Sequence, residues 1–188
     1  MNNKVTPFLL TLALLVAAWF TLSPKVKAAD IPAEASEEVS TLLADVKAEA
    51  HQLERDNEEL KTFVQSATPL SWHSHATKLN EIREHINKTG QLLTNLNEAR
   101  DQASPWQQRA IDEIRPLLQE LANNTEATIN HLSEYKDRIN LAPDFSDYVT
   151  ANHDLSRELA ALVTDYVDYG KHQAEFQRLQ EKLQVTTK

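Results

Sequence analysis

Apolar residues recur alternately three and four positions apart along most of the chain beyond residue 33. This is the spacing of one face of an α-helix that packs against neighbouring helices. Short proline-containing breaks interrupt the pattern at residues 67–70, 103–105 and 141–144. The pattern therefore predicts four helices, over about residues 33–67, 72–102, 105–141 and 145–184.

Each predicted helix carries one line of residues that we expect to face a common core. In the first three helices the lines cover residues 39–64, 72–96 and 111–139 and consist mainly of leucine, isoleucine and valine. The line of the fourth helix is richer in aromatic residues and comprises Tyr148, Asn152, Leu155, Leu159, Leu162, Tyr166, Tyr169, Gln173, Phe176, Leu179 or Gln180, and Leu183.

Long helices with connections of only a few residues have to lie antiparallel to their neighbours. We therefore predict an all-α fold: an up-down-up-down antiparallel four-helix bundle with long, coiled-coil-like helices and left-handed packing. Only two glycines and seven prolines occur in 188 residues, too few for the many turns of a sheet protein. The alternative is an extended array of helical hairpins that completes its core by dimerising.

The first 28 residues differ in character from the rest of the chain. Lys4 precedes a largely apolar run over residues 8–22, and Val26 and Ala28 stand at the positions usual before a secretory cleavage site. We therefore predict a bacterial-type signal peptide over residues 1–28, with cleavage between Ala28 and Ala29 and with the bundle over residues 29–188.

Export to the periplasm or the medium follows from this prediction. The apolar run is shorter than the roughly 20 residues that a membrane-spanning helix needs. The alternative is a retained signal, which would make the bundle a membrane-anchored stalk or sensor domain.

The charge balance limits the classes of partner. The chain has 19 Lys and Arg residues against 28 Asp and Glu, a formal net charge of −9, and removal of residues 1–28 leaves 16 against 28, or −12. A surface of this sign repels phosphate backbones and anionic headgroups, so we expect no nucleic-acid partner and no membrane partner after cleavage. The chain has no cysteine, so it forms no disulfide.

Two asparagines interrupt the predicted core lines. Asn57 in the first helix and Asn152 in the fourth lie at similar depths from the same end of an antiparallel bundle. A buried asparagine is costly unless it is paired, and its best-attested use is to fix the register of packed helices. We predict that the two form a buried polar layer, and contact with a ligand is the alternative.

The seven histidines raise the question of a metal site. None belongs to an HExxH or Glu-x-x-His pattern, in which the ligands share one helix face. Only His75 falls on a predicted core line; we expect His51 and His153 to point outward and His85 and His131 to lie at the flank. We therefore predict neither a metal nor another cofactor.

Catalytic patterns are also missing from the sequence. It contains no cysteine nucleophile, no G-x-S-x-G and no glycine-rich phosphate loop, and its paired acids are typical of solvated helix faces. The leading hypothesis is an exported, non-enzymatic bundle, a structural or protein-interaction module that presents helical faces to another protein or to its own copy. The alternative is a periplasmic sensor or carrier that binds a ligand or a metal inside the bundle.

Overall fold

The computed structural model describes residues 35–68, 70–136, 138 and 144–183. The chain divides into the units Met1–Ile31 and Pro32–Lys188, and all described residues belong to the second. The predicted cleavage site at Ala28 and Ala29 therefore lies outside the described residues.

The described residues form helices and no strand. The elements in chain order are α1 (Glu37–Gln65), α2 (Trp72–Glu98), the short 3₁₀ helix η1 (Arg100–Gln102), α3 (Pro105–Tyr135) and α4 (Phe145–Leu183).

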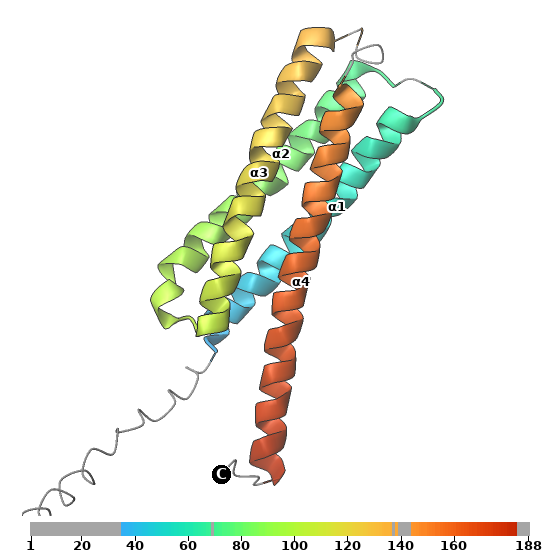
Figure 1. Cartoon of the computed structure of the whole chain (residues 1–188). Helices are drawn as coiled ribbons and strands as arrows, with labels where there is room; N and C mark the ends of the chain where they lie inside the picture. Colours follow the sequence, from blue (N-terminus) through green and yellow to red (C-terminus); the bar gives the residue numbers. More distant parts are fainter. Residues whose placement is uncertain (1–34, 69, 137, 139–143, 184–188) are drawn as a thin grey trace, which may run out of the picture. The chain divides into compact units, whose positions relative to one another are not determined.

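The four α-helices pack against each other around one core. Both α1 and α3 pack against α2 and α4, so that every helix has two neighbours. Successive helices run in opposite directions (Figure 1). The predicted all-α class and the packing of four helices are confirmed. The contact between α1 and α4, the first and last helices, closes the bundle and rules out the open array of hairpins.

The helix ends differ from the prediction where the backbone turns early. The α-helical part of α2 stops at Glu98, and η1 continues the chain to Gln102. The third helix, predicted to reach residue 141, ends at Tyr135 because Lys136 adopts a positive φ of 33°, which is incompatible with an α-helix. None of the described helices combines the length and the apolarity needed to cross a bilayer.

A buried glutamine joins the starts of α1 and α3. Gln107, in the first turn of α3, accepts hydrogen bonds from the N–H of Ser104 (2.9 Å) and the N–H of Ser36 (3.0 Å). Its side-chain amide donates to the carbonyl of Ser36 (2.9 Å). Backbone groups at the starts of both helices are thereby satisfied, and the two starts lie at the same end of the bundle.

Most residues of the predicted core lines of the first three helices are buried, with Leu43, Leu79 and Ile114 at zero exposure, while Val64, Trp72 and Tyr135 near the helix ends are half-buried. Ile139, the last residue of the third predicted line, lies outside the described residues.

The prediction for α4 was only partly right: Asn152 and Leu159 are buried as predicted, but Leu155, Leu162 and Tyr166 of the predicted line are only partly buried. The other buried residues are shifted by one position around the helix and are Phe145, Val149, His153, Ser156, Ala160, Val163 and Val167. The buried positions of α4 thus include small side chains such as valine and serine, while half-buried Tyr166 donates its hydroxyl to Glu113 at 2.7 Å.

Candidate interaction surface

Helix α4 extends beyond the other three helices (Figure 1). It has 39 residues, compared with 29 in α1, 27 in α2 and 31 in α3. From residue 171 to residue 183 none of its residues is buried. We call residues 171–183 the α4 end; Gln173 and Gln180 are half-buried, and all its other residues are exposed.

The packing of α3 against α4 ends at a tryptophan. Trp106, in the first turn of α3, lies so close to Gly170 that a Cβ on this glycine would be 2.7 Å from Trp106 Cη2. The ring of Tyr169 meets the Trp106 ring edge to face, with the centroids 5.5 Å apart. On the α1 side, Lys47 pairs with Asp168 at 3.1 Å, and its hydrogen bond lowers the pKa of that carboxyl group. These contacts mark the last layer of the bundle.

Large apolar side chains are exposed at this layer and beyond it. They are Tyr169, Phe176, Leu179 and Leu183, with exposed fractions of 52%, 62%, 42% and 66%. They account for all the large apolar side chains that are exposed in the described part of the chain. Their spacings of seven, three and four residues place them on one helix face, which we call the α4 stripe.

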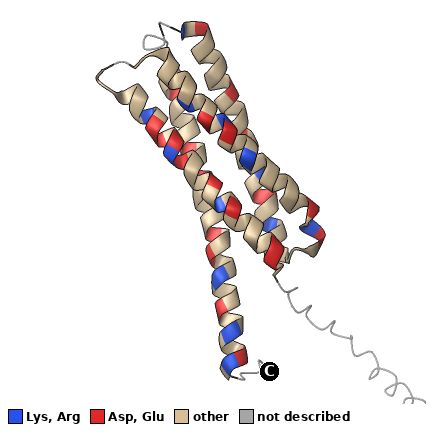
Figure 2. Ribbon diagram, turned by 180° about the vertical axis from the view of Figure 1, so that it is seen from behind, with Lys and Arg blue, Asp and Glu red and all other residues tan. Residues whose placement is uncertain are grey.

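The charges of the α4 end are mixed. Lys171, Arg178 and Lys182 alternate with Glu175 and Glu181, and Figure 2 shows blue and red positions alternating along this part of α4. Such a pattern beside an apolar stripe is typical of a helix that pairs with another helix.

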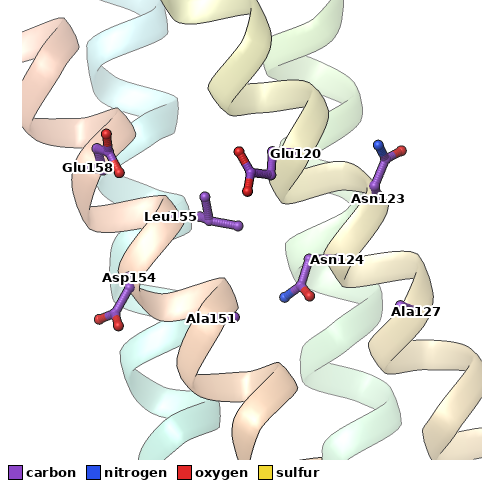
Figure 3. A pocket seen from close by; sticks show the side chains of 8 residues that line it. All are labelled: Glu120, Asn123, Asn124, Ala127, Ala151, Asp154, Leu155 and Glu158. Carbon is purple, nitrogen blue, oxygen red and sulfur yellow. The ribbon is translucent and has the colours of Figure 1, made fainter.

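A surface groove lies between α3 and α4 nearer the middle of the bundle (Figure 3). It has a volume of about 490 Å³, and Glu120, Asn124 and Leu155 point into the space between the two helices. Asp154 and Glu158 add two more carboxylates, and no Lys or Arg lines the groove. The Asn124 amide donates to Asn152 and to the backbone of α4, so the polar groups that line the groove are mainly carboxylates.

Asn152 is the centre of a hydrogen-bond network between α3 and α4. It is fully buried, and its Oδ1 accepts from Asn124 Nδ2 and from Thr125 Oγ1, both at 3.0 Å. Its Nδ2 donates to Thr128 Oγ1 at 3.1 Å. Sequence reasoning missed this network; the signal that could have indicated it is the pair of polar residues Thr125 and Thr128 on the predicted core line of the third helix.

Asn57 is also fully buried but is bonded differently. Its Nδ2 donates to the Leu53 carbonyl of its own helix at 2.8 Å. Its Oδ1 is buried and has no hydrogen-bond partner among the described residues. Within that part of the chain no hydrogen bond joins Asn57 to Asn152, so their shared polar layer stays a prediction.

His75 is buried at the end of the bundle that lies opposite the α4 end, with 1% of the residue exposed. Its ring meets the rings of Phe63 and Phe145 edge to face, with centroids 6.2 and 5.4 Å away. Its Nδ1 is buried and unpartnered among the described residues. Burial lowers the pKa of His75, because the charged form loses its hydration.

The outward orientation predicted for His153 was wrong. The structure leaves only 8% of this residue exposed, with Nε2 2.6 Å from a Glu58 oxygen and Nδ1 3.2 Å from Lys61 Nζ. The cause is that the buried face of α4 is shifted by one position from the predicted face, so that His153 faces α1. Within the described ranges, no group of three or more His, Asp or Glu side chains is arranged to hold a metal ion.

A charge cluster fixes α2 to α1. Lys78 Nζ lies 3.5 Å from Asp56, 2.7 Å from Glu59 and 2.5 Å from Glu81. Burial by itself would lower the pKa of Lys78, but the hydrogen bonds to the two glutamates outweigh it and raise this pKa above its usual value. Because Lys78 keeps its positive charge, the carboxylate of Asp56, which is only 5% exposed, has a cation beside it.

Comparison of the chain with known protein families, with curated proteins and with solved structures gave no significant match.

Proposed function

We propose that this protein is an exported, non-enzymatic helical bundle that acts by presenting the α4 stripe to an apolar helical surface of a protein partner. The observation that carries the proposal is the location of the exposed large apolar side chains, which all lie on one face of α4 at or beyond Tyr169. Exposed apolar side chains gathered on one face are typical of interaction sites. A helical segment of about 12–15 residues has little stability in water without a neighbour, which favours a partner that covers it.

Export is proposed from the sequence of residues 1–28. The proposal includes cleavage between Ala28 and Ala29 and, for the bundle, coiled-coil-like packing with left-handed crossing of the helices. Intact-mass spectrometry of the protein recovered from its native envelope tests the cleavage. A mass that begins at Ala29 is the expected result, and a mass that begins at Met1 would show a retained segment.

Photo-crosslinking tests the α4 stripe in the native envelope. A photoreactive residue at Gln180, which borders the stripe, is expected to give a crosslinked protein product. The matched control is the same residue at Ala174, which is exposed on the opposite face of α4. The product is expected to disappear when Phe176→Glu is added. Equal yields from positions 180 and 174 would contradict the proposal.

A function in the bundle interior makes a different prediction. Thermal melts with and without zinc, copper or iron, together with metal analysis of the purified protein, distinguish the two. We expect no shift in melting temperature with any of these metals. Stoichiometric binding of a metal would overturn the proposal in favour of a sensor or carrier.

A further inference from the structure

We infer that the partner of the α4 stripe is the α4 end of a second copy of this chain, and that the two helices pair antiparallel. The inference rests on the proposed function, because it names the partner of the same surface. It is carried by the spacing of the stripe, by the charges that border it and by the area it leaves exposed.

The spacing is that of a two-stranded coiled coil. Tyr169, His172, Phe176, Leu179 and Leu183 follow each other at intervals of three, four, three and four residues, the a and d positions of a heptad repeat. Antiparallel pairing places a positions against d positions. With a two-fold axis between Phe176 and Leu179, Phe176 of each copy faces Leu179 of the second copy. Leu183 then faces His172. The same patch is used by both copies, as a closed dimer requires.

The bordering charges favour the antiparallel direction. Glu175 and Lys182 each precede an a position by one residue and so occupy g positions on the same side of the stripe. In an antiparallel pair the g positions face each other, so Glu175 of one copy lies beside Lys182 of the second, twice by symmetry. In a parallel pair the g positions face the e positions, which here are the uncharged Gln173 and Gln180.

The charge of the bundle supports the same direction. Residues 29–170 carry 12 Lys and Arg against 26 Asp and Glu, a formal charge of −14. Parallel pairing of the α4 ends would bring two such bundles side by side. Antiparallel pairing holds them at opposite ends of the paired helices and reduces their repulsion.

The exposed area predicts a weak dimer. With about 200 Å² for each large side chain, the exposed fractions leave roughly 450 Å² of the stripe uncovered on one copy and roughly 900 Å² on two. The bordering side chains bring the total toward about 1,200 Å², the lower limit for stable interfaces. The dimer is therefore reversible and dissociates on dilution.

Sedimentation equilibrium of the exported protein over a wide concentration range tests the inference. The wild type is expected to dimerise. Glu175→Lys and Lys182→Glu each replace two attractive pairs by two repulsive ones and are expected to weaken the dimer about tenfold. The double variant E175K/K182E restores the attraction and is expected to dimerise like the wild type. Glu181→Lys makes the same charge change on the opposite face and is the matched control.

The outcomes separate this inference from the proposed function. A dimer that responds equally to Glu175→Lys and Glu181→Lys would overturn the antiparallel pairing. A wild type that stays monomeric, while the probe at Gln180 captures a different protein in a manner lost with Phe176→Glu, would overturn the inference and leave the function standing. A monomer without any crosslink would overturn both, as would stripe-dependent binding to phosphatidylglycerol vesicles. The substituted side chains lie outside the bundle, so each variant is expected to fold like the wild type. Melting curves check this.

Discussion

Leucine substitutions at the two buried asparagines are expected to differ sharply in their effect on stability. Asn152→Leu removes three hydrogen bonds, to Asn124, Thr125 and Thr128. At about 1 kcal/mol for each hydrogen bond, the loss is about 3 kcal/mol. Asn124 keeps its bond to the Tyr148 carbonyl, and Thr125 can turn its hydroxyl to a carbonyl of its own helix. We therefore expect a destabilisation of about 2–3 kcal/mol.

Asn57→Leu removes much less. The residue makes one hydrogen bond, to Leu53, and holds one buried oxygen without a partner among the described residues. Removing an unsatisfied polar atom from the interior gains about 1–3 kcal/mol. Fitting the larger leucine side chain costs a similar amount, about 1–3 kcal/mol. The variant is therefore expected to stay within about 1 kcal/mol of the wild type.

Urea unfolding followed by far-ultraviolet circular dichroism measures both effects, and thermal melts should show a loss of about 5–10 °C for Asn152→Leu. Thr125→Val, which removes one hydroxyl at constant volume, is the matched control and is expected to cost about 1 kcal/mol. If Asn57→Leu is as damaging as Asn152→Leu, this reasoning from hydrogen bonds is refuted. The double leucine variant tests the shared layer: strict additivity of the two free energies would contradict it.

Three further measurements probe other parts of the bundle. Gly90→Ala is expected to stabilise the fold by about 0.5–1 kcal/mol, because a Cβ there meets nothing within 4 Å and alanine favours a helix. Gly170→Ala is expected to destabilise the fold, because its Cβ would collide with the Trp106 ring. A higher melting temperature for both variants would contradict the close packing of Trp106 on Gly170. The folded state binds a proton at His75 less readily than the unfolded chain, so the free energy of unfolding should fall as pH drops below about 6.5, by at most about 1.4 kcal/mol per pH unit. His75→Phe should remove this part of the slope, and an unchanged slope would sink the assignment. Lys78→Met leaves the buried Asp56 carboxylate with its hydrogen bond from Gln52 but without the lysine, and is expected to cost about 1–3 kcal/mol in urea unfolding, as for a buried acceptor that loses a partner. A neutral result would show that the carboxylate is satisfied without Lys78.

The sequence was sufficient to predict the helices and three of the four core lines, because large aliphatic residues such as Leu43 and Ile114 occur in a single helical register. It was only partly right for α4, where two neighbouring lines both have helical spacing and share Asn152 and Leu159. The line through Leu155 and Tyr166 has the larger side chains, and the line through Val163 has the smaller ones that fit between close helices. Periodicity cannot choose between two such lines, since the choice depends on the distance between helices.

The exposure of the α4 end could not be predicted from the sequence for a related reason. Its apolar residues continue the spacing of the core, so Phe176 was predicted to lie on the core line. Nothing in the local pattern shows that a neighbouring helix has ended. The third helix was also predicted to reach residue 141, and its actual end at Tyr135 increases the difference in length between α3 and α4.

The boundary at Trp106 and Gly170 divides α4 into two parts that should differ in how often they open. Backbone amides before this point open with the bundle, while those of residues 171–183 are protected only by local helix formation and should exchange with solvent far sooner. If the α4 ends pair as inferred above, the helix content of residues 171–183 increases with the fraction of the protein that is paired. Association and local folding would then be one equilibrium, and the rigidity of the α4 end would depend on protein concentration.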